Sequence, residues 1–273
     1  MKNLLLATNL GVNSQQALER ALLVARLHKA ALHVIHVASA HDGSAEEELA
    51  RQVAAAVAYL EAHLPEEFGA GFKPASFKSV AGDPVQAIVA EADMCDADLT
   101  ITGLSEKPGA RGLIDSTILE RLLMTSARPS IVVKSRPTRN YESVLVGLDL
   151  SPTSHHALEA ALRVAPTADL IIAHAKETGS GDGDTGDTLA RITKECLAAA
   201  RKDVGVHEGA VQILIEDGPV ADVLSRCAGK SAPDLVAFGK HNKGLSHGPY
   251  IGSGARGVLE ELDADMLVVP PGE

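Results

Sequence analysis

The stretch KNLLLATNL at residues 2–10 returns as ESVLVGLDL at residues 142–150. After a short gap, each copy leads into a matching pattern of small and apolar residues, ALERALLVA at residues 17–25 and ALEAALRVA at residues 157–165. Repetition at a fixed spacing is the sequence signature of a duplicated structural unit. We therefore predict two copies of one module of about 135 residues, which is a common size for a single domain.

The second half of each module repeats at a slightly shorter spacing. Gly103 and Gly239 lie 136 residues apart, whereas the opening stretches lie 140 residues apart. A loop between the first helix and the third strand can absorb this difference. The segment SRPTRN at residues 135–140 is polar, contains proline and suits a linker. We therefore expect domains at residues 1–136 and 141–273.

Short apolar runs alternate with longer helical patterns in both copies. We expect strands at residues 3–9, 31–37, 75–81, 98–103, 130–134, 142–149, 169–175, 210–216, 234–239 and 265–269. We expect helices at residues 14–28, 44–63, 84–94, 116–126, 154–165, 186–203, 220–229 and 253–262. Ser14 and Ser154 suit the N-caps of the first helices, and Pro84 and Pro219 suit a first helical turn. Apolar strands joined by helices predict a doubly wound α/β domain with a parallel sheet, which binds ligands at the carboxyl ends of its strands.

Composition limits the partners that the chain can have. The net charge of −11 disfavours broad attachment to nucleic acid or to an anionic membrane. Cys95, Cys196 and Cys227 show neither a disulfide framework nor the spacing of zinc ligands. No apolar run has the length of a membrane helix. We therefore expect a cytoplasmic protein with reduced thiols and no metal site.

The segment GKHNKGLSHGPYIGSGARG at residues 239–257 follows the fourth strand of the second copy. Glycine at a strand end lets the main chain approach a ligand closely, and N–H groups at a helix start bind phosphate oxygens together with a serine hydroxyl. The lysines and histidines of the segment add local positive charge. A phosphate-binding loop and a solvated glycine-rich connection both fit this composition.

A second glycine-rich segment, GSGDGDTGD at residues 179–187, alternates glycine with aspartate. Such a pattern resembles a calcium-binding loop, but the glutamate that closes an EF-hand loop is missing. We expect a mobile surface loop at this place.

Several landmarks occur in the same order in both copies. They are the β-α repeat of this length, a strand-one Asp or Asn followed by a serine, a turn of the G-x-P type before the third helix, and a loop related to Gly-x-x-Gly-x9-Gly-Ser/Thr after strand four. In these features the sequence resembles the universal stress proteins over essentially its whole length. The resemblance implies Rossmann-like domains, each with a five-stranded parallel sheet of order 3-2-1-4-5, and in many members an ATP or AMP site formed by that loop. It also implies that the two domains pair through their fifth strands as an intramolecular pseudo-dimer.

In the second copy the loop retains most of the family pattern, with Asn242 in place of the second glycine. Asparagine tolerates a left-handed backbone better than other residues with a side chain, so the exchange weakens the site without closing it. The resemblance implies that Asp149 lies at the nucleoside end and that the backbone of Ala175 contacts the base. The candidate cofactor-binding residues of this copy are Asp149, Ala175, Gly239, His241, Asn242, Gly252, Ser253 and Gly254.

The first copy departs further from the family pattern. Asn9 replaces the aspartate, Ser116 replaces a glycine, and Glu106 places a negative charge near the expected phosphates. We therefore predict a degenerate site that mainly supports its partner domain. The candidate residues of this copy are Asn9, Val37, Gly103, Ser116 and Thr117.

Three functions remain open. The leading hypothesis is a cytoplasmic stress-response protein that binds adenine nucleotide, ATP or AMP with or without Mg²⁺, mainly through its second domain, and acts as a regulator or signalling module. The second is a tandem interaction scaffold without nucleotide, which Asn9, Glu106 and Asn242 favour. The third is a slow ATPase, although the chain has no P-loop and we predict no catalytic residue. We expect no nucleic-acid or membrane partner, and symmetry allows a homodimer without requiring one.

Overall fold

The computed structural model describes residues 1–38, 44–64, 74–104, 116–176, 185–204, 209–240 and 262–272. The chain forms two compact units, unit 1 from Met1 to Asn140 and unit 2 from Tyr141 to Glu273. In each unit, strands alternate with helices along the chain. The predicted α/β class with two tandem units is therefore confirmed.

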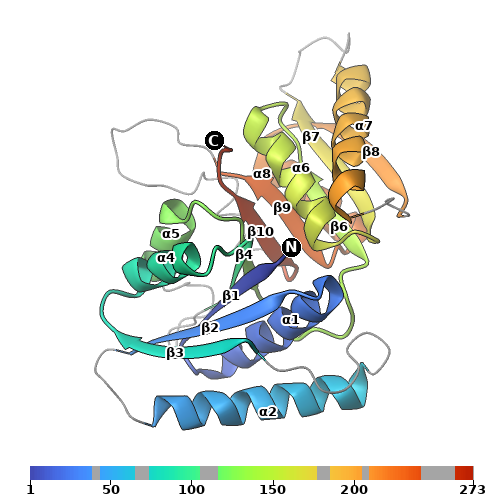
Figure 1. Cartoon of the computed structure of the whole chain (residues 1–273). Coiled ribbons are helices and arrows are strands. Elements are labelled where there is room, and N and C mark those ends of the chain that lie inside the picture. Colours follow the sequence, from blue (N-terminus) through green and yellow to red (C-terminus); the bar gives the residue numbers. More distant parts are fainter. Residues whose placement is uncertain are drawn as a thin grey trace. The chain divides into compact units, whose positions relative to one another are not determined.

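Unit 1 contains a five-stranded parallel sheet. Its strands are β1 (Asn3–Thr8), β2 (Ala31–Ala38), β3 (Ser76–Ala81), β4 (Leu99–Gly103) and β5 (Ser130–Val133). Its helices are α1 (Val12–His28), α2 (Ala45–His63), α4 (Pro84–Met94) and α5 (Ser116–Thr125). The strand order is β3-β2-β1-β4-β5, with α1 and α2 on one side of the strands and α4 and α5 on the other (Figure 1). The order 3-2-1-4-5 is therefore confirmed.

Unit 2 repeats this topology. Its strands are β6 (Ser143–Gly147), β7 (Asp169–Lys176), β8 (Val211–Asp217), β9 (Leu235–Gly239) and β10 (Asp265–Val269). Its described helices are α6 (Pro152–Val164), α7 (Thr185–Val204) and α8 (Val220–Ser231). The strand order is β8-β7-β6-β9-β10, again parallel throughout. The predicted helix at residues 253–262 falls almost wholly outside the described residues, as do residues 179–184 of the glycine-rich segment.

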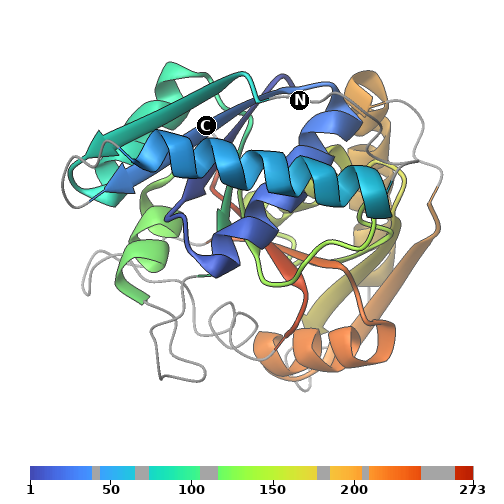
Figure 2. The same ribbon diagram turned by 90° about the horizontal axis from the view of Figure 1, so that it is seen from below.

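The central strands are buried on both faces. Residues 4–6 of β1 and residues 144–146 of β6 have no exposed surface. A strand covered by helices on both sides needs apolar side chains at successive positions rather than at alternate ones. Helix α2 is amphipathic instead and lies across α1 (Figure 2). Its buried residues recur at helical spacing: Ala45, Leu49, Val53, Ala56 and Leu60.

The first helix of each unit begins earlier than predicted. Gly11 is the N-cap of α1. Ser151 is the N-cap of α6, and its hydroxyl accepts a hydrogen bond from the Ser154 N–H at 3.2 Å. The prediction of Ser14 and Ser154 as N-caps is therefore wrong, because both serines lie inside the first helical turn.

The helices α4 and α8 start differently. Asp83 caps α4 by accepting a hydrogen bond from a first-turn N–H at 3.0 Å, and Pro84 opens the helix as predicted. In unit 2, Pro219 occupies the N-cap position itself, so its predicted place inside the helix is wrong. Both starts follow a glycine, Gly82 with φ of 140° and Gly218 with φ of 130°, a conformation that residues with a Cβ rarely adopt.

The predicted linker is bonded to the helices of unit 1. Arg136 donates two hydrogen bonds to Glu19 of α1, from Nε to Oε2 at 2.8 Å and from Nη2 to Oε1 at 2.6 Å. Its guanidinium also lies 3.4 Å from the ring centre of Tyr59 in α2. The Glu19 side chain has no exposed surface, and its hydrogen bonds raise the pKa of Arg136. Residue 136 therefore takes part in the packing of unit 1.

The thiols are shielded from solvent. Cys196 and Cys227 are buried and Cys95 is half-buried. Burial raises the pKa of all three thiols, that of Cys196 to about 11, and a raised pKa suppresses the reactive thiolate at neutral pH. Within the described ranges, no group of three His, Cys, Asp or Glu side chains could hold a metal ion. None of the described helices is long and apolar enough to cross a membrane.

Candidate ligand-binding site

The central strand of each unit ends in the same turn, which presents Asn9 in unit 1 and Asp149 in unit 2. In both cases the Oδ1 atom accepts a hydrogen bond from the N–H two residues later, at 2.9 Å and 3.0 Å respectively. The residue after each has a left-handed φ, 59° and 66°. The N–H groups of Asn9 and Asp149 donate to the hydroxyls of Ser14 and Ser154, both at 3.3 Å. Asn9 and Asp149 therefore occupy equivalent places.

A histidine on the second strand holds the end of the first strand in each unit. His36 Nδ1 lies 3.0 Å from the Thr8 carbonyl oxygen, and His174 Nδ1 lies 2.7 Å from the Leu148 carbonyl oxygen. A carbonyl oxygen only accepts hydrogen bonds, so Nδ1 carries the hydrogen in both rings. The two histidines therefore act as donors that fix the strand ends.

The strand β7 extends past the end of β6. The Ala173 carbonyl faces β6, where it accepts a hydrogen bond from the Leu148 N–H at 2.9 Å, whereas the Lys176 carbonyl faces the opposite neighbour and accepts from the Gly218 N–H at 3.1 Å. Successive residues of a strand direct their peptide groups to opposite neighbours. The N–H and C=O of Ala175 therefore point to the β6 side, where the chain has already turned toward α6.

Unit 1 has a cavity of about 170 Å³ at the carboxyl ends of β1, β2 and β4. Its wall brings together three predicted residues, Asn9, Val37 and Gly103. Ser116 and Thr117 open α5, the helix that contributes Leu122 to the same wall. No charged side chain belongs to the described part of this wall. The predicted unit 1 site is therefore a cavity with a largely apolar lining.

In unit 2 a lysine takes the place of a leucine of the unit 1 cavity. Leu104 follows β4 and lines the cavity, and its N–H donates to the Val133 carbonyl at 3.1 Å. Lys240 follows β9 and donates in the same way to the Val269 carbonyl at 2.8 Å. The Lys240 side chain is only 8% exposed, and its burial lowers the pKa of the ammonium to about 8. The sequence indicated its charge but not its burial.

The structure gives Gly239 a packing role. A Cβ at this position would lie 2.6 Å from Cγ2 of Thr153 and 2.9 Å from the carbonyl carbon of Thr153. The first turn of α6 therefore approaches the strand end too closely for any side chain. The sequence predicted a close approach of a ligand at Gly239, and the described contact is an approach of a helix.

The remaining predicted residues of unit 2 fall outside the described ranges. They are His241, Asn242, Gly252, Ser253 and Gly254. The described ones, Asp149, Ala175 and Gly239, stand at the carboxyl ends of the neighbouring strands β6, β7 and β9.

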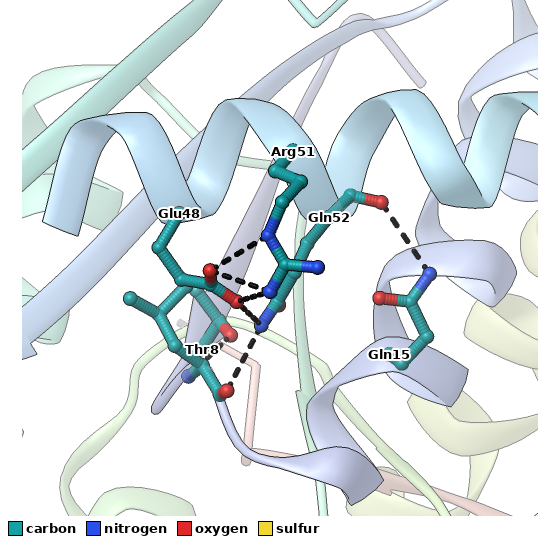
Figure 3. A network of polar contacts seen from close by, with 6 residues as sticks. Thr8, Gln15, Glu48, Arg51 and Gln52 are labelled. Carbon is teal, nitrogen blue, oxygen red and sulfur yellow. Dashed lines mark hydrogen bonds and ion pairs between the residues drawn. The ribbon is translucent and has the colours of Figure 1, made fainter. Parts of the chain in front are cut away.

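A polar network on α2 supports the strand-end turn of unit 1 (Figure 3). Gln52 Nε2 donates to the Leu10 carbonyl at 2.9 Å and to Glu48 Oε1 at 2.8 Å. Hydrogen bonds from Arg51 and Gln52 lower the pKa of Glu48. Gln15 of α1 donates to the Gln52 carbonyl at 3.4 Å. Side chains of α1 and α2 thus hold the turn that carries Asn9.

The comparison with protein families decides to which family this fold belongs. The model of the universal stress protein family matches residues 1–134 and, a second time, residues 140–270. The chain belongs to the universal stress protein family. Both copies of the repeat are therefore universal stress protein domains.

Curated relatives of this universal stress protein match about half of its length. Universal stress protein A of Salmonella typhi is 30% identical over 140 residues, which is 48% of this chain and 94% of the relative. Universal stress protein A of Escherichia coli K12 is 29% identical over the same length and the same shares. Each of these relatives corresponds in length to about half of the tandem chain.

Two solved structures share the whole tandem fold. A universal stress protein from Archaeoglobus fulgidus has a TM-score of 0.70 and 22% identity, covering 99% of this chain and 98% of that one. The protein PA1789 from Pseudomonas aeruginosa, described as functionally unknown, has a TM-score of 0.67 and 22% identity, covering 99% and 93%. At this level of identity the likeness establishes the fold alone.

Proposed function

We propose that this universal stress protein binds an adenine nucleotide, ATP or AMP, mainly through unit 2, and acts in the cytoplasm as a stress-response regulator or signalling module. The observation that carries the proposal is the orientation of the Ala175 peptide groups. They present a donor and an acceptor side by side at the carboxyl edge of the sheet, beyond the last residue of β6. Adenine offers a complementary pair, the amino group N6 and a neighbouring ring nitrogen.

A carboxylate stands next to this backbone pair. Asp149 is exposed and follows β6, the strand beside β7. Carboxylates at this edge of a doubly wound sheet accept hydrogen bonds from ribose hydroxyls. A base on Ala175 and a ribose on Asp149 would direct the phosphates toward the glycine-rich segment that follows Gly239. That segment has the glycines and the serine that suit phosphate oxygens.

Unit 1 is less suited to a nucleotide. Asn9 has the backbone role of Asp149 but lacks the carboxylate, and the described wall of its cavity holds no charge. We therefore assign one nucleotide site to each chain. Mg²⁺ would accompany ATP as a ligand of its phosphates, and we assign no catalytic residue.

Calorimetric titration of the nucleotide-free full chain with ATP and with AMP, with and without Mg²⁺, tests the proposal. We expect one site per chain. Asp149→Ala should weaken binding by about tenfold or more, the usual effect of losing a hydrogen bond to a charged group. Asn9→Ala is the matched control, because it removes the same turn-forming side chain from unit 1.

Two results would overturn the assignment. Absence of heat up to millimolar nucleotide would leave a tandem interaction scaffold as the function. A site lost in Asn9→Ala and kept in Asp149→Ala would move nucleotide binding to unit 1. Phosphate release, measured in the same samples, decides whether ATP is turned over.

A further inference from the structure

Within the residues that the structure describes, β8 is the outermost strand of unit 2 (Figure 1). It is parallel to β7, where the Ala210 carbonyl accepts from the Leu170 N–H at 2.8 Å and the Gly218 N–H donates to the Lys176 carbonyl at 3.1 Å. Successive residues of a strand direct their peptide groups to opposite sides, so the even-numbered residues face β7. The peptide groups that point away from the sheet are those of Val211, Ile213 and Ile215.

The same residues carry apolar, β-branched side chains on one face of β8. A Cβ on Gly186 of α7 would lie 3.8 Å from Cδ1 of Ile215, so Ile215 faces α7. Alternation along the strand places Val211 and Ile213 on that face too. Val211 and Ile215 are each 40% exposed. The strand therefore combines outward-pointing peptide groups with exposed apolar side chains.

The outermost strand of unit 1, β3, differs in this respect. The Ala75 N–H donates to the Leu32 carbonyl at 2.7 Å, so residues 76, 78 and 80 direct their peptide groups outward. Lys78 stands in the middle of them and forms an ion pair with Glu91 of α4. A charged side chain on an edge strand discourages pairing with another strand. The sequence of β8, VQILIED, contains neither lysine nor proline, and its charges lie at its end.

The charged end of β8 is bonded within unit 2. Glu216 accepts hydrogen bonds from Arg226 Nε at 2.9 Å and from Lys230 Nζ at 2.8 Å. Arg226 also donates to the Asp217 carbonyl at 2.9 Å, and this carbonyl is the next outward-pointing one after that of Ile215. The stretch of the edge that suits a further strand is therefore uncharged and covers residues 211–215.

We propose that two copies of the chain associate through this stretch of β8, as antiparallel strands centred on Ile213. A two-fold axis at this place sets Ile213 opposite its own copy and Val211 opposite Ile215 of the partner subunit. The outward N–H and C=O groups of these residues then exchange hydrogen bonds, and their side chains pair on the face of α7. The inference does not depend on the binding of nucleotide.

Charge favours a second copy in this register. The chain has a net charge of −11, so two copies repel each other unless their contact is uncharged. In the proposed register the acidic residues 216 and 217 lie opposite residues 210 and 209, which are alanine and glycine. Moving the centre to Leu214 would bring Asp217 into the pairing, although its carbonyl is already bonded. The edge is therefore complementary to itself, and the pairing closes after two copies.

Sedimentation equilibrium of the full chain tests the pairing. One short strand covers less than the roughly 1,600 Å² of a standard interface, so we expect a weak dimer with a dissociation constant of about 10–100 µM. Ile213→Pro removes an outward N–H and keeps the hydrogen bonds to β7. It should weaken the dimer about tenfold or more, because the symmetry removes two hydrogen bonds. Val80→Pro, at an outward position of β3, is the matched control and should leave the dimer unchanged.

A pair of charges tests the register. Val211→Lys and Ile215→Glu should each weaken the dimer, because each sets a charge against an apolar side chain. The double variant places lysine opposite glutamate of the partner subunit, so the dimer should return. Hydrogen exchange of the unmodified chain gives a further readout. The N–H of Ile213 should gain protection between about 1 and 300 µM protein, whereas the N–H of Leu214, which faces β7, should be protected throughout.

Three results would overturn the proposal. The first is a chain that stays monomeric up to about 300 µM, which would exclude a second copy as the occupant of this edge. The second is a dimer that Ile213→Pro leaves unchanged, because the contact would then lie elsewhere. The third is a double variant that stays monomeric although far-ultraviolet circular dichroism shows it folded, which would refute the register.

Discussion

Lys240→Met should stabilise the ligand-free protein. The pKa of Lys240 is about 8 in the folded chain against an ordinary value of 10.5, because its side chain is buried. A difference of 2.5 pH units, at 1.36 kcal/mol for each, amounts to about 3 kcal/mol that the charged lysine costs the folded state at pH 7. Methionine carries no charge and fills a similar volume, so the free energy of unfolding should rise by about this amount.

The stabilising effect of Lys240→Met should depend on pH. A lysine with a lowered folded pKa is protonated in both states below pH 8, so the full cost is present there. As the pH rises from 8 toward 10.5, the folded chain loses its proton first and the cost disappears. The advantage of Lys240→Met over the unmodified protein should therefore be largest below pH 8 and should vanish near pH 10.5.

Urea unfolding at pH 7 and at pH 10 measures this difference. The chain has no tryptophan, so far-ultraviolet circular dichroism is the suitable probe. The exposed Lys194→Met serves as control and should change the free energy of unfolding by less than about 0.5 kcal/mol. A Lys240→Met protein that is no more stable than the unmodified chain at pH 7, or whose advantage at pH 10 is as large as at pH 7, would refute the burial of a charged lysine at this site.

Two further predictions concern packing. Gly239→Ala should lower the free energy of unfolding by about 1–3 kcal/mol, because the added Cβ would lie 2.9 Å from the backbone of Thr153. Gly229→Ala, with no atom within 4 Å of the new Cβ, should instead raise it by up to about 1 kcal/mol, and similar effects of the two substitutions would contradict the contact. Arg136→Ala should cost about 1–2 kcal/mol, a value that allows for solvent screening at a side chain that is 48% exposed, because the buried Glu19 loses two hydrogen bonds. In urea unfolding, Arg136→Lys should be more stable than Arg136→Ala but less stable than the unmodified chain. Full stability of Arg136→Lys would show that the two parallel hydrogen bonds of the guanidinium are unimportant there.

The topology was accessible from the sequence because burial on both faces produces a simple signal. The strands β1 and β6 contain continuous apolar runs, and one helix separates each of them from the next strand. The repeat doubled this signal, since each element was supported by its counterpart in the other unit. The order of the strands came from the resemblance to a family and not from the periodicity.

The helix starts were less accessible because several residues compete for the same role. A serine shortly before a helical pattern is a good N-cap, and we predicted Ser154 for this role, but the N-cap of α6 is Ser151, three residues earlier. The Ser154 hydroxyl instead accepts a hydrogen bond from the Asp149 N–H, a contact over five residues in a turn with left-handed backbone. The local sequence pattern does not reveal such a turn, because the turn depends on the direction in which the chain leaves the strand.

The most informative site residue was missed for a similar reason. Lys240 stands in a segment rich in glycine, lysine and histidine, where a lysine is ordinarily solvated. Its burial follows from its place one residue after β9, on the same side of the sheet as Phe238. Its counterpart in unit 1, Leu104, lines the wall of a cavity.

The duplicated fold separates residues that hold the backbone from residues that set the charge of the site. Ser14 and Ser154 bond the two strand ends in the same way. Asn9 and Asp149 hold the turn through the same Oδ1 atom, so folding tolerates either side chain and does not dictate the charge. Lys240 differs from these residues, because its buried charge lowers the free energy of unfolding. Urea unfolding of Lys240→Met at pH 7 and at pH 10 measures how much that buried charge costs the folded chain.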